Sequence, residues 1–168
     1  MAKQIMHPFP PLFDGSSEIL ILGSFPSVKS REQQFFYGHP QNRFWRVTAA
    51  VFQQDVPQTI DEKRAFLLRN HIALWDVIAS CEITGSSDSS IRNVVPNDLS
   101  PIFTAAQIRQ VFVNGGTAAK YYEKYQKNTL GRDAIRLPST SPANAAWSVE
   151  RLTDAWRIIR NPETAAET

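Results

Sequence analysis

The sequence has 168 residues, of which 42% are hydrophobic and 20% are charged, and its net charge is +2; we expect one globular domain over residues 1–168. The single cysteine, Cys81, and three histidines without HExxH spacing argue against a disulfide framework, a metal centre or an iron–sulfur cluster, so we expect no cofactor. No stretch is long enough to cross a membrane, and the start, MAKQIMHPFPP, lacks the apolar core of a signal peptide. We therefore expect a cytoplasmic protein without a membrane partner, whose mild positive charge is compatible with nucleic acid but does not require it.

The first half of the chain alternates between strand and helix patterns. Residues 1–17 are rich in proline, and we expect them to form an irregular lead-in. The apolar run EILILG, 18–23, is typical of a strand buried on both faces, and residues 24–40 then read as a long loop. Apolar residues at helical spacing predict a helix from Gln41, and acids in the first turn of DEKRAFLLRNH favour a second helix from Asp61.

The second half continues this alternation. We expect strands in IALWDVI (72–78), IRQVFVNG (108–115) and the start of AIRLPSTSPAN (134–144), and helices in LSPIFTAA, TAAKYYEKYQK and WSVERLTDAWRIIR (147–160). The polar stretch 82–98 is expected to be a loop, and residues 161–168 a frayed tail. The alternation predicts an α/β fold, a parallel sheet with helices on both faces.

Ligands bind to such sheets beyond the carboxyl ends of the strands, and this sequence is most unusual there. GSFPSVKS, 23–30, follows the first strand and offers small residues for a close ligand approach, with hydroxyls and Lys29 for a phosphate. It matches neither GxxxxGK[ST] nor GxGxxG, and an ordinary strand-to-helix turn is the alternative.

The segment FFYGHPQNRFW, 35–45, divides into two parts. Phe44 and Trp45 have the spacing of core residues on a helix. The three aromatic residues before the glycine, Phe35, Phe36 and Tyr37, are candidates for a wall on which a base stacks.

Three polar side chains, His39, Asn42 and Asn114, have both a structural and a functional interpretation. His39 is more simply a structural hydrogen-bonding group than a base, and Asn42 suits a helix cap. Asn114 ends a buried strand, where its amide matches a base edge or suits a left-handed turn before glycine. We expect Asp88 to belong to a hydrogen-bonded loop cluster.

Six segments, in order from residue 19 to 145, resemble the motifs of the uracil-DNA glycosylase superfamily: ILILGSFPS, HPQNRFW, LWDV, GSSDSSI, VFVNG and LPSTSPAN. The similarity is closest to the hypoxanthine-DNA (deoxyinosine) and mismatch-specific branches, and HPQNRFW is the most specific segment. The resemblance implies a three-layer α/β/α sandwich on a short, mainly parallel four-stranded sheet. It also implies a monomeric, metal-free enzyme that hydrolyses the N-glycosidic bond of a deaminated base in DNA and leaves an abasic site.

The resemblance further implies roles for individual residues. The residues that line the water and base site are Gly23, Ser24, Phe25, Pro26 and Ser27, followed by His39. One of Phe35, Phe36 and Tyr37 stacks on the base, and the spacing back from His39 favours Phe35. Asn114 reads the base edge. The loop that presses into the minor groove contains Pro138, Ser139, Ser141, Pro142, Ala143 and Asn144. The phosphate contacts are Ser24, Ser27, Lys29 and Arg43.

The sequence departs from the family pattern at two places. Phe25 stands where the first motif usually carries an Asp or Asn that positions water, and Leu137 opens a last motif that often begins with histidine. Asn42 is the best substitute for a catalytic amide, and Asn114 is the second. These departures favour hypoxanthine over uracil and leave a catalytically weak or inactive lesion-binding relative as the alternative. A nucleotide-binding α/β enzyme is a third interpretation, disfavoured by the missing phosphate-loop motifs.

Overall fold

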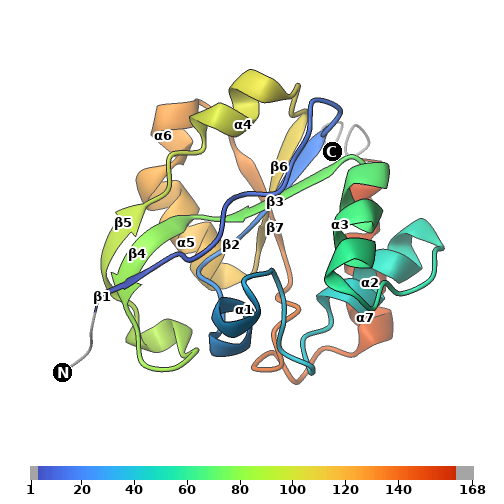
Figure 1. The fold of residues 1–168 in the computed structure, drawn as a ribbon, viewed down its shortest axis with the longest axis horizontal. Helices are drawn as coiled ribbons and strands as arrows, with labels where there is room; N and C mark the ends of the chain where they lie inside the picture. Colours follow the sequence, from blue (N-terminus) through green and yellow to red (C-terminus); the bar gives the residue numbers. More distant parts are fainter. Residues whose placement is uncertain (1–3, 162–168) are drawn as a thin grey trace.

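The computed structural model describes residues 4–161 (Figure 1). Residue 161 has no regular structure, and the rest of the expected frayed tail lies outside the described residues. Within the described range, no helix combines the length and the apolar character needed to cross a bilayer.

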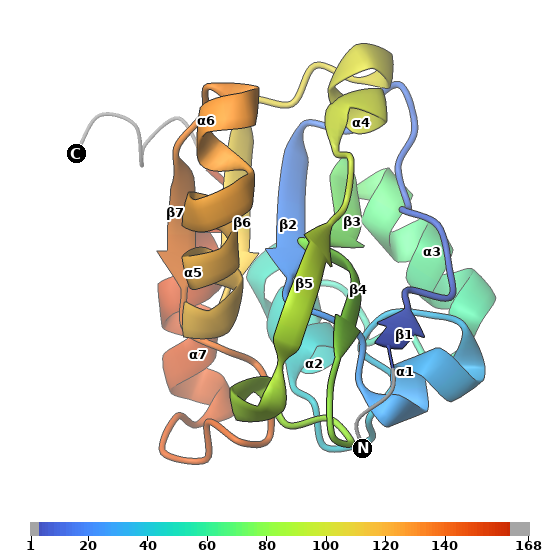
Figure 2. The same ribbon diagram turned by 90° about the vertical axis from the view of Figure 1, so that its left-hand side faces the viewer.

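The centre of the molecule is a four-stranded parallel sheet in the order β3-β2-β6-β7 (Figure 2). Its strands are β2 (Ile19–Gly23), β3 (Ile72–Asp76), β6 (Gln110–Asn114) and β7 (Ala134–Leu137). All residues of β2 are buried, as its continuous apolar run predicts for a central strand covered on both faces. The predicted parallel sheet is therefore confirmed.

Alternate residues of β2 point into two separate cores. Ile19 and Ile21 pack with three helices, α2 (Phe44–Phe52), α3 (Ile60–Arg69) and α7 (Val149–Trp156). Leu20 and Leu22 pack on the other face with α4 (Ser100–Ala105) and α5 (Gly116–Tyr125), which the short α6 (Lys127–Leu130) follows. Helices thus lie on both sides of the sheet, which confirms the expected three-layer sandwich (Figure 1).

A second sheet of three antiparallel strands was not expected from the sequence. It has the order β1-β4-β5 and consists of β1 (Gln4–Met6), β4 (Ile78–Glu82) and β5 (Arg92–Pro96). The predictions of an irregular lead-in and of a loop at 82–98 were therefore wrong for the residues of β1 and β5. Each edge strand is too short or too polar to show a strand pattern, and β5 ends in a proline, which an edge strand tolerates.

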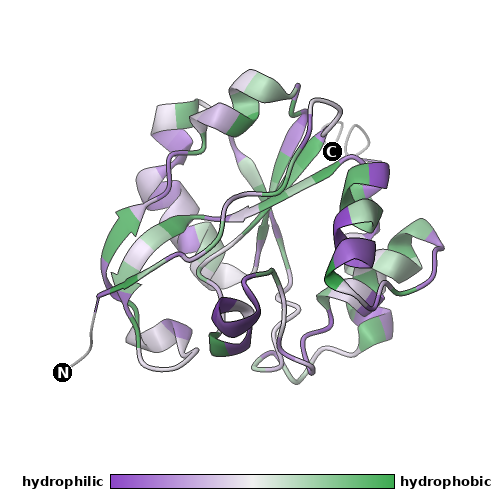
Figure 3. Cartoon of the chain, in the orientation of Figure 1, coloured by the Kyte–Doolittle hydropathy of each residue, from purple (hydrophilic) through white to green (hydrophobic). Residues whose placement is uncertain are grey.

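The loop expected over 24–40 contains a helix, α1 (Val28–Gln33). The side chain of Ser27 accepts a hydrogen bond from the backbone N–H of Ser30 and caps the start of this helix. Figure 3 shows that α1 is strongly hydrophilic, so it has no apolar periodicity that would reveal it in the sequence. Two short 3₁₀ turns complete the structure, at Asp88–Ser90 and at Arg157–Ile159, the latter continuing α7.

Candidate active site

A pocket of about 370 Å³ lies at the carboxyl ends of β2, β3 and β6, where parallel sheets bind their ligands. It collects segments that are far apart in the sequence. The residues that line it include Gly23, Ser24, Phe25, Pro26, Ser27, Phe36, Tyr37, His39, Asn42, Asp76, Asp88, Asn114, Ser139, Thr140, Ser141, Pro142 and Ala143. Most of the residues predicted for the site are therefore together, and the exceptions are Lys29, Phe35, Arg43, Pro138 and Asn144.

Glycine at position 23 allows a carboxylate to cross the end of the central strand. Gly23 of β2 pairs in register with Asp76 of β3. A Cβ at position 23 would lie 2.5 Å from Asp76 Oδ1 and 3.4 Å from the Tyr37 hydroxyl. Any larger residue would displace the carboxylate, so Gly23 shapes the floor of the pocket.

Two of the three aromatic residues expected in the wall of the pocket, Phe36 and Tyr37, line it, and the favoured one, Phe35, does not. Phe35 is 4% exposed and packs in the core, its ring stacked on that of Trp45 with centroids 6.2 Å apart. Phe25, Phe36 and Tyr37 line the pocket instead. The expectation that Phe35 stacks on the base is thus corrected, because its ring is turned into the core beneath the pocket.

Tyr37 presents a protonated hydroxyl. Its ring stacks on Phe44, with centroids 4.0 Å apart and an interplanar angle of 15°, and its backbone has a φ of 49°. Burial raises the pKa of Tyr37 above its ordinary value, the carboxylate of Asp76 adds to this, and the hydrogen bond from Asn114 acts in the opposite direction. The hydroxyl therefore keeps its proton at neutral pH.

Asn114 ties strand β6 to the loop after β7. Its Oδ1 accepts a hydrogen bond from the backbone N–H of Thr140 at 3.1 Å, and its Nδ2 donates to Thr140 Oγ1 at 3.0 Å and to the Tyr37 hydroxyl at 3.3 Å. Gly115 follows with a φ of 94°, which glycine adopts without strain, and is the N-cap residue of α5. Both polar atoms of the amide are thus occupied by the protein itself.

Asn42 lines the pocket and also makes a hydrogen bond in the turn before α2. Its Oδ1 accepts a hydrogen bond from the backbone N–H of Phe44 at 2.9 Å, at the start of α2. The helix expected from Gln41 begins at Phe44, with Arg43 as its N-cap residue, and the Asn42 contact lies in the turn just before it. Asn42 Nδ2 has no hydrogen-bond acceptor within residues 4–161 and belongs to a side chain that lines the pocket.

His39 also lines the pocket, and its Nδ1 lies 3.1 Å from the backbone N–H of Gln41. This contact makes Nδ1 an acceptor and assigns the proton of a neutral ring to Nε2. The structural interpretation of His39 is therefore supported, and its ring Nε2 remains a donor beside the pocket.

The two basic residues expected to contact DNA phosphates do not line the pocket. The guanidinium group of Arg43 donates to four carbonyl oxygens of the loop after β7, those of Thr140, Ser141, Asn144 and Trp147. Lys29 is exposed outside the pocket and pairs with Glu32 at 3.5 Å. Arg43 is thus corrected from a phosphate contact to the residue that holds this loop.

The loop at 138–144 is held by hydrogen bonds between residues that are close in the sequence. Ser139 Oγ accepts from the backbone N–H of Ser141 at 3.1 Å, and Asn144 Nδ2 donates to the Ser139 carbonyl at 2.9 Å. The carbonyl of Pro138 accepts from Trp156 Nε1 at 2.9 Å, which anchors the loop to α7. Pro138 and Asn144 line a second hollow of about 510 Å³ next to the pocket rather than the pocket itself.

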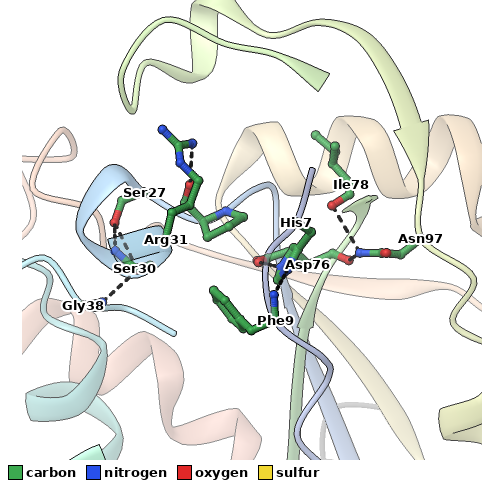
Figure 4. A network of polar contacts seen from close by, with 10 residues as sticks. His7, Phe9, Ser27, Ser30, Arg31, Gly38, Asp76, Ile78 and Asn97 are labelled. Carbon is green, nitrogen blue, oxygen red and sulfur yellow. Dashed lines mark hydrogen bonds and ion pairs between the residues drawn. The ribbon is translucent and has the colours of Figure 1, made fainter. Parts of the chain in front are cut away.

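Two carboxylates and a histidine at the site were not predicted. His7 Nε2 lies 2.8 Å from Asp76 Oδ2, and their side chains are 3% and 7% exposed (Figure 4). The sequence placed Asp76 at a strand end, which was the available signal, whereas His7 lies in a segment without a recognisable pattern. No sequence pattern connects the two residues.

Asp88 was expected only in a loop cluster, yet it lines the pocket. The residue is exposed at the loop surface, but its carboxyl group lies against Ser24 Oγ, at 3.2 Å, and the side chain of Thr117. Desolvation raises the pKa of Asp88, the hydrogen bonds from Ser24 and Thr117 act in the opposite direction, and the negative charge of Asp76 raises it further. Within residues 4–161 there is no group of three or more His, Cys, Asp or Glu side chains placed to hold a metal ion.

The fold and the site define a class of protein: an α/β/α sandwich with an aromatic-walled pocket at the carboxyl ends of its parallel strands. The family model described as the Uracil DNA glycosylase superfamily matches residues 10–161. The chain belongs to this superfamily, which confirms the resemblance seen in the sequence.

Relatives from the genus Methanosarcina carry more specific names. The chain is 34% identical over 155 residues to a protein of Methanosarcina acetivorans named hypoxanthine DNA glycosylase, a match covering 91% of this chain and 97% of that protein. It is 34% identical over 137 residues to a Methanosarcina barkeri protein of the same name, covering 81% and 86%. A solution NMR structure of an M. acetivorans protein, described as a candidate uracil DNA glycosylase, superimposes with a TM-score of 0.78 at 34% identity over 92% and 96% of the two chains.

Proposed function

We propose that the protein is a monofunctional DNA glycosylase that hydrolyses the N-glycosidic bond of a deaminated base and leaves an abasic site. Hypoxanthine is the first substrate and uracil the second. The observation that carries this proposal is the strand-end pocket, which places aromatic walls and free hydrogen-bond donors together. The relatives named hypoxanthine DNA glycosylase support the substrate class.

The pocket supplies what a flipped base requires. A base inside a duplex is out of reach, so it must be extruded and then held by stacking and edge contacts. Phe25, Phe36 and Tyr37 provide the apolar surface, and Tyr37 is additionally supported from behind by Phe44. The volume of about 370 Å³ lies at the lower end of the range for small-ligand pockets, which suits one base and its sugar.

The departing base leaves as an anion and needs donors that are already in place. Asn42 Nδ2 and the Tyr37 hydroxyl, whose oxygen accepts from Asn114, are donors at the pocket that have no acceptor among the described residues. Because Oδ1 of Asn42 is used by the helix start, its remaining group is a donor. We therefore assign Asn42 to the departing base and Asn114 to the positioning of Tyr37.

The partner is DNA that contains deaminated bases, bound by a monomer. Pro142 and Ala143 lie at the rim of the pocket on a loop that Arg43 holds from below. A rigid loop suits insertion beside the extruded nucleotide better than a flexible loop, because less conformational freedom is lost on binding.

The test is an excision assay on labelled duplexes that contain deoxyinosine, uracil, xanthine or mismatched thymine, each treated with alkali after incubation. The proposal expects strand breaks at deoxyinosine, with uracil weaker. An absence of product on every lesion, together with tight and selective lesion binding, would instead support the inactive lesion-binding relative that Phe25 suggests.

A further inference from the structure

The pocket contains two carboxylates among its described lining residues, and their hydrogen bonding differs. The carboxyl group of Asp88 already accepts hydrogen bonds from Ser24 and Thr117. Asp76 Oδ2 accepts from His7 Nε2 at 2.8 Å, while Asp76 Oδ1 has no donor within residues 4–161. Asp76 therefore keeps one oxygen available to a molecule in the pocket.

His7 is placed to keep Asp76 in one orientation. The backbone N–H of Phe9 lies 3.4 Å from His7 Nδ1, which makes Nδ1 an acceptor and puts the proton of a neutral ring on Nε2. The imidazole is confined by edge contacts with Phe9 and Phe25, at centroid distances of 4.5 and 5.9 Å. The donor to Asp76 is thus fixed by the fold, and it holds the carboxylate in one orientation.

The free oxygen of Asp76 lies against the first motif. Gly23 and Asp76 are register partners in β2 and β3, and Oδ1 occupies the space that a Cβ at position 23 would need. Phe25, two residues further on, is apolar and lacks an acceptor for water. A carboxylate on the neighbouring strand thus reaches the part of the pocket where the first motif has none.

We propose that Asp76 is the catalytic carboxylate that positions the attacking water, and that His7 is the positioning residue that orients it. This inference rests on the proposed glycosidic hydrolysis. An anion beside the sugar also stabilises the positive charge that develops at the anomeric carbon as the bond breaks.

The step balances without a metal or a redox partner. The bond between the base nitrogen and the anomeric carbon breaks, and its electron pair leaves with the base, which Asn42 and Tyr37 stabilise. The water oxygen bonds to the anomeric carbon, and one water proton passes to Asp76. That proton then leaves to the departed base or to solvent, which restores the carboxylate and yields an abasic sugar and a neutral base.

The charged and titratable groups that act on Asp76 come from three elements. His7 lies after β1, Tyr37 lies after α1, and Asp88 lies in the 3₁₀ turn before β5. Of these, His7 is the hydrogen-bond donor to the carboxylate. Replacing it with an apolar residue therefore removes the contact that orients the carboxylate.

The first experiment measures single-turnover excision from a deoxyinosine duplex. Asp76→Asn is compared with Asp133→Asn, which makes the same change in charge at a side chain that is 85% exposed and outside the pocket. We expect a loss of about 100-fold or more for Asp76→Asn and none for Asp133→Asn. His7→Gln, which retains a donor, should retain most activity, whereas His7→Phe should lose it.

A second measurement does not depend on turnover. Each protein is titrated with a duplex carrying a cationic pyrrolidine abasic analogue and with one carrying a neutral tetrahydrofuran analogue. The ionised Asp76 should make the wild-type protein prefer the cation by about tenfold or more, and Asp76→Asn should lose this preference while Asp133→Asn keeps it.

The outcomes separate the two proposals. If the wild-type protein excises hypoxanthine and Asp76→Asn remains within about threefold of it, the role of Asp76 is refuted while the glycosylase function stands. If no protein excises any lesion, the proposed function fails, the catalytic role of Asp76 that rests on it fails with it, and the affinity comparison decides only whether Asp76 contacts the sugar as an anion. An equal preference for the cation in wild type and Asp76→Asn, or none in the wild-type protein, overturns that contact.

Discussion

Asn114 and Thr140 are joined twice: the Thr140 backbone N–H donates to Asn114 Oδ1 at 3.1 Å, and Asn114 Nδ2 donates to Thr140 Oγ1 at 3.0 Å. Thr140 is fully buried, so neither of its polar groups has water as a substitute partner. This pair links the end of β6 to the loop after β7, and it leaves Asn114 Nδ2 one further contact, to the Tyr37 hydroxyl. The Asn114 amide, which was expected to contact a base, therefore holds two parts of the pocket wall, Thr140 and Tyr37, in place.

Asn114→Ala should lower stability as well as activity, because it leaves the buried N–H and hydroxyl of Thr140 without partners. We expect the free energy of unfolding, measured by urea denaturation, to fall by about 1–3 kcal/mol. Thr140→Ser keeps both hydrogen bonds and should lose less. If Asn114→Ala keeps full stability but loses discrimination between bases, Asn114 contacts the base edge, as the sequence predicted.

Arg43→Lys should destabilise the loop at 138–147, because an ammonium group does not reproduce the planar set of donors that meets four carbonyls. We expect faster proteolysis in this loop and weaker binding to a lesion duplex, with little change in the dependence of affinity on salt. Lys29→Ala is the matched control and should leave proteolysis unchanged. A reduced salt slope for Arg43→Lys, with an intact loop, would favour the original expectation of a phosphate contact.

Substitutions at Asn42 distinguish its hydrogen bond at the start of α2 from its proposed role as a donor to the departing base. Asn42→Asp keeps an oxygen for the Phe44 N–H but removes the amide donor, so it should fold with wild-type stability and excise hypoxanthine about 100-fold more slowly. Asn42→Ala should lose the same activity and, in addition, about 1 kcal/mol of stability. Excision by Asn42→Asp at the wild-type rate would show that Asn42 is a cap only.

The stability of the protein should fall in alkali. Burial raises the pKa of Tyr37 above its ordinary value and raises that of Tyr122 to about 12. Unfolding returns both hydroxyls to an ordinary pKa of about 10, so above that pH the unfolded chain binds fewer protons than the folded chain and stability decreases as pH rises. Tyr37→Phe should reduce this slope, as measured by urea denaturation between pH 9 and about 11. An identical slope in the variant would contradict the burial of an un-ionised Tyr37 hydroxyl.

The sequence predicts the large sheet well, for a physical reason. Parallel strands covered on both faces are continuous apolar runs, and β2 shows this in each of its five residues. The small sheet gives no such signal, because β1 has three residues and β5 is mostly polar and lies at an edge. α1 was missed for a related reason, since its one buried residue is Ser30.

The site was predictable only where it follows from strand order. Ser24, Asn114 and the loop after Leu137 come together because parallel strands end at one edge. The turn of Phe35 into the core and of Phe36 and Tyr37 toward the pocket depends on backbone angles, including the left-handed Tyr37, that spacing does not reveal. The contact between His7 and Asp76 joins residues 69 positions apart through the unexpected β1, and it could not be inferred without that strand.

Hydrolysis of a glycosidic bond in this pocket is tested most directly by measuring release of the base itself. The protein is incubated with a deoxyinosine duplex, and free hypoxanthine is quantified by chromatography beside the labelled strand. We predict one free hypoxanthine for each abasic site, a strand that breaks only after alkali, and loss of both signals in Asn42→Asp. Release of no hypoxanthine by the wild-type protein would contradict glycosidic hydrolysis, and strand cleavage without alkali would contradict a monofunctional glycosylase.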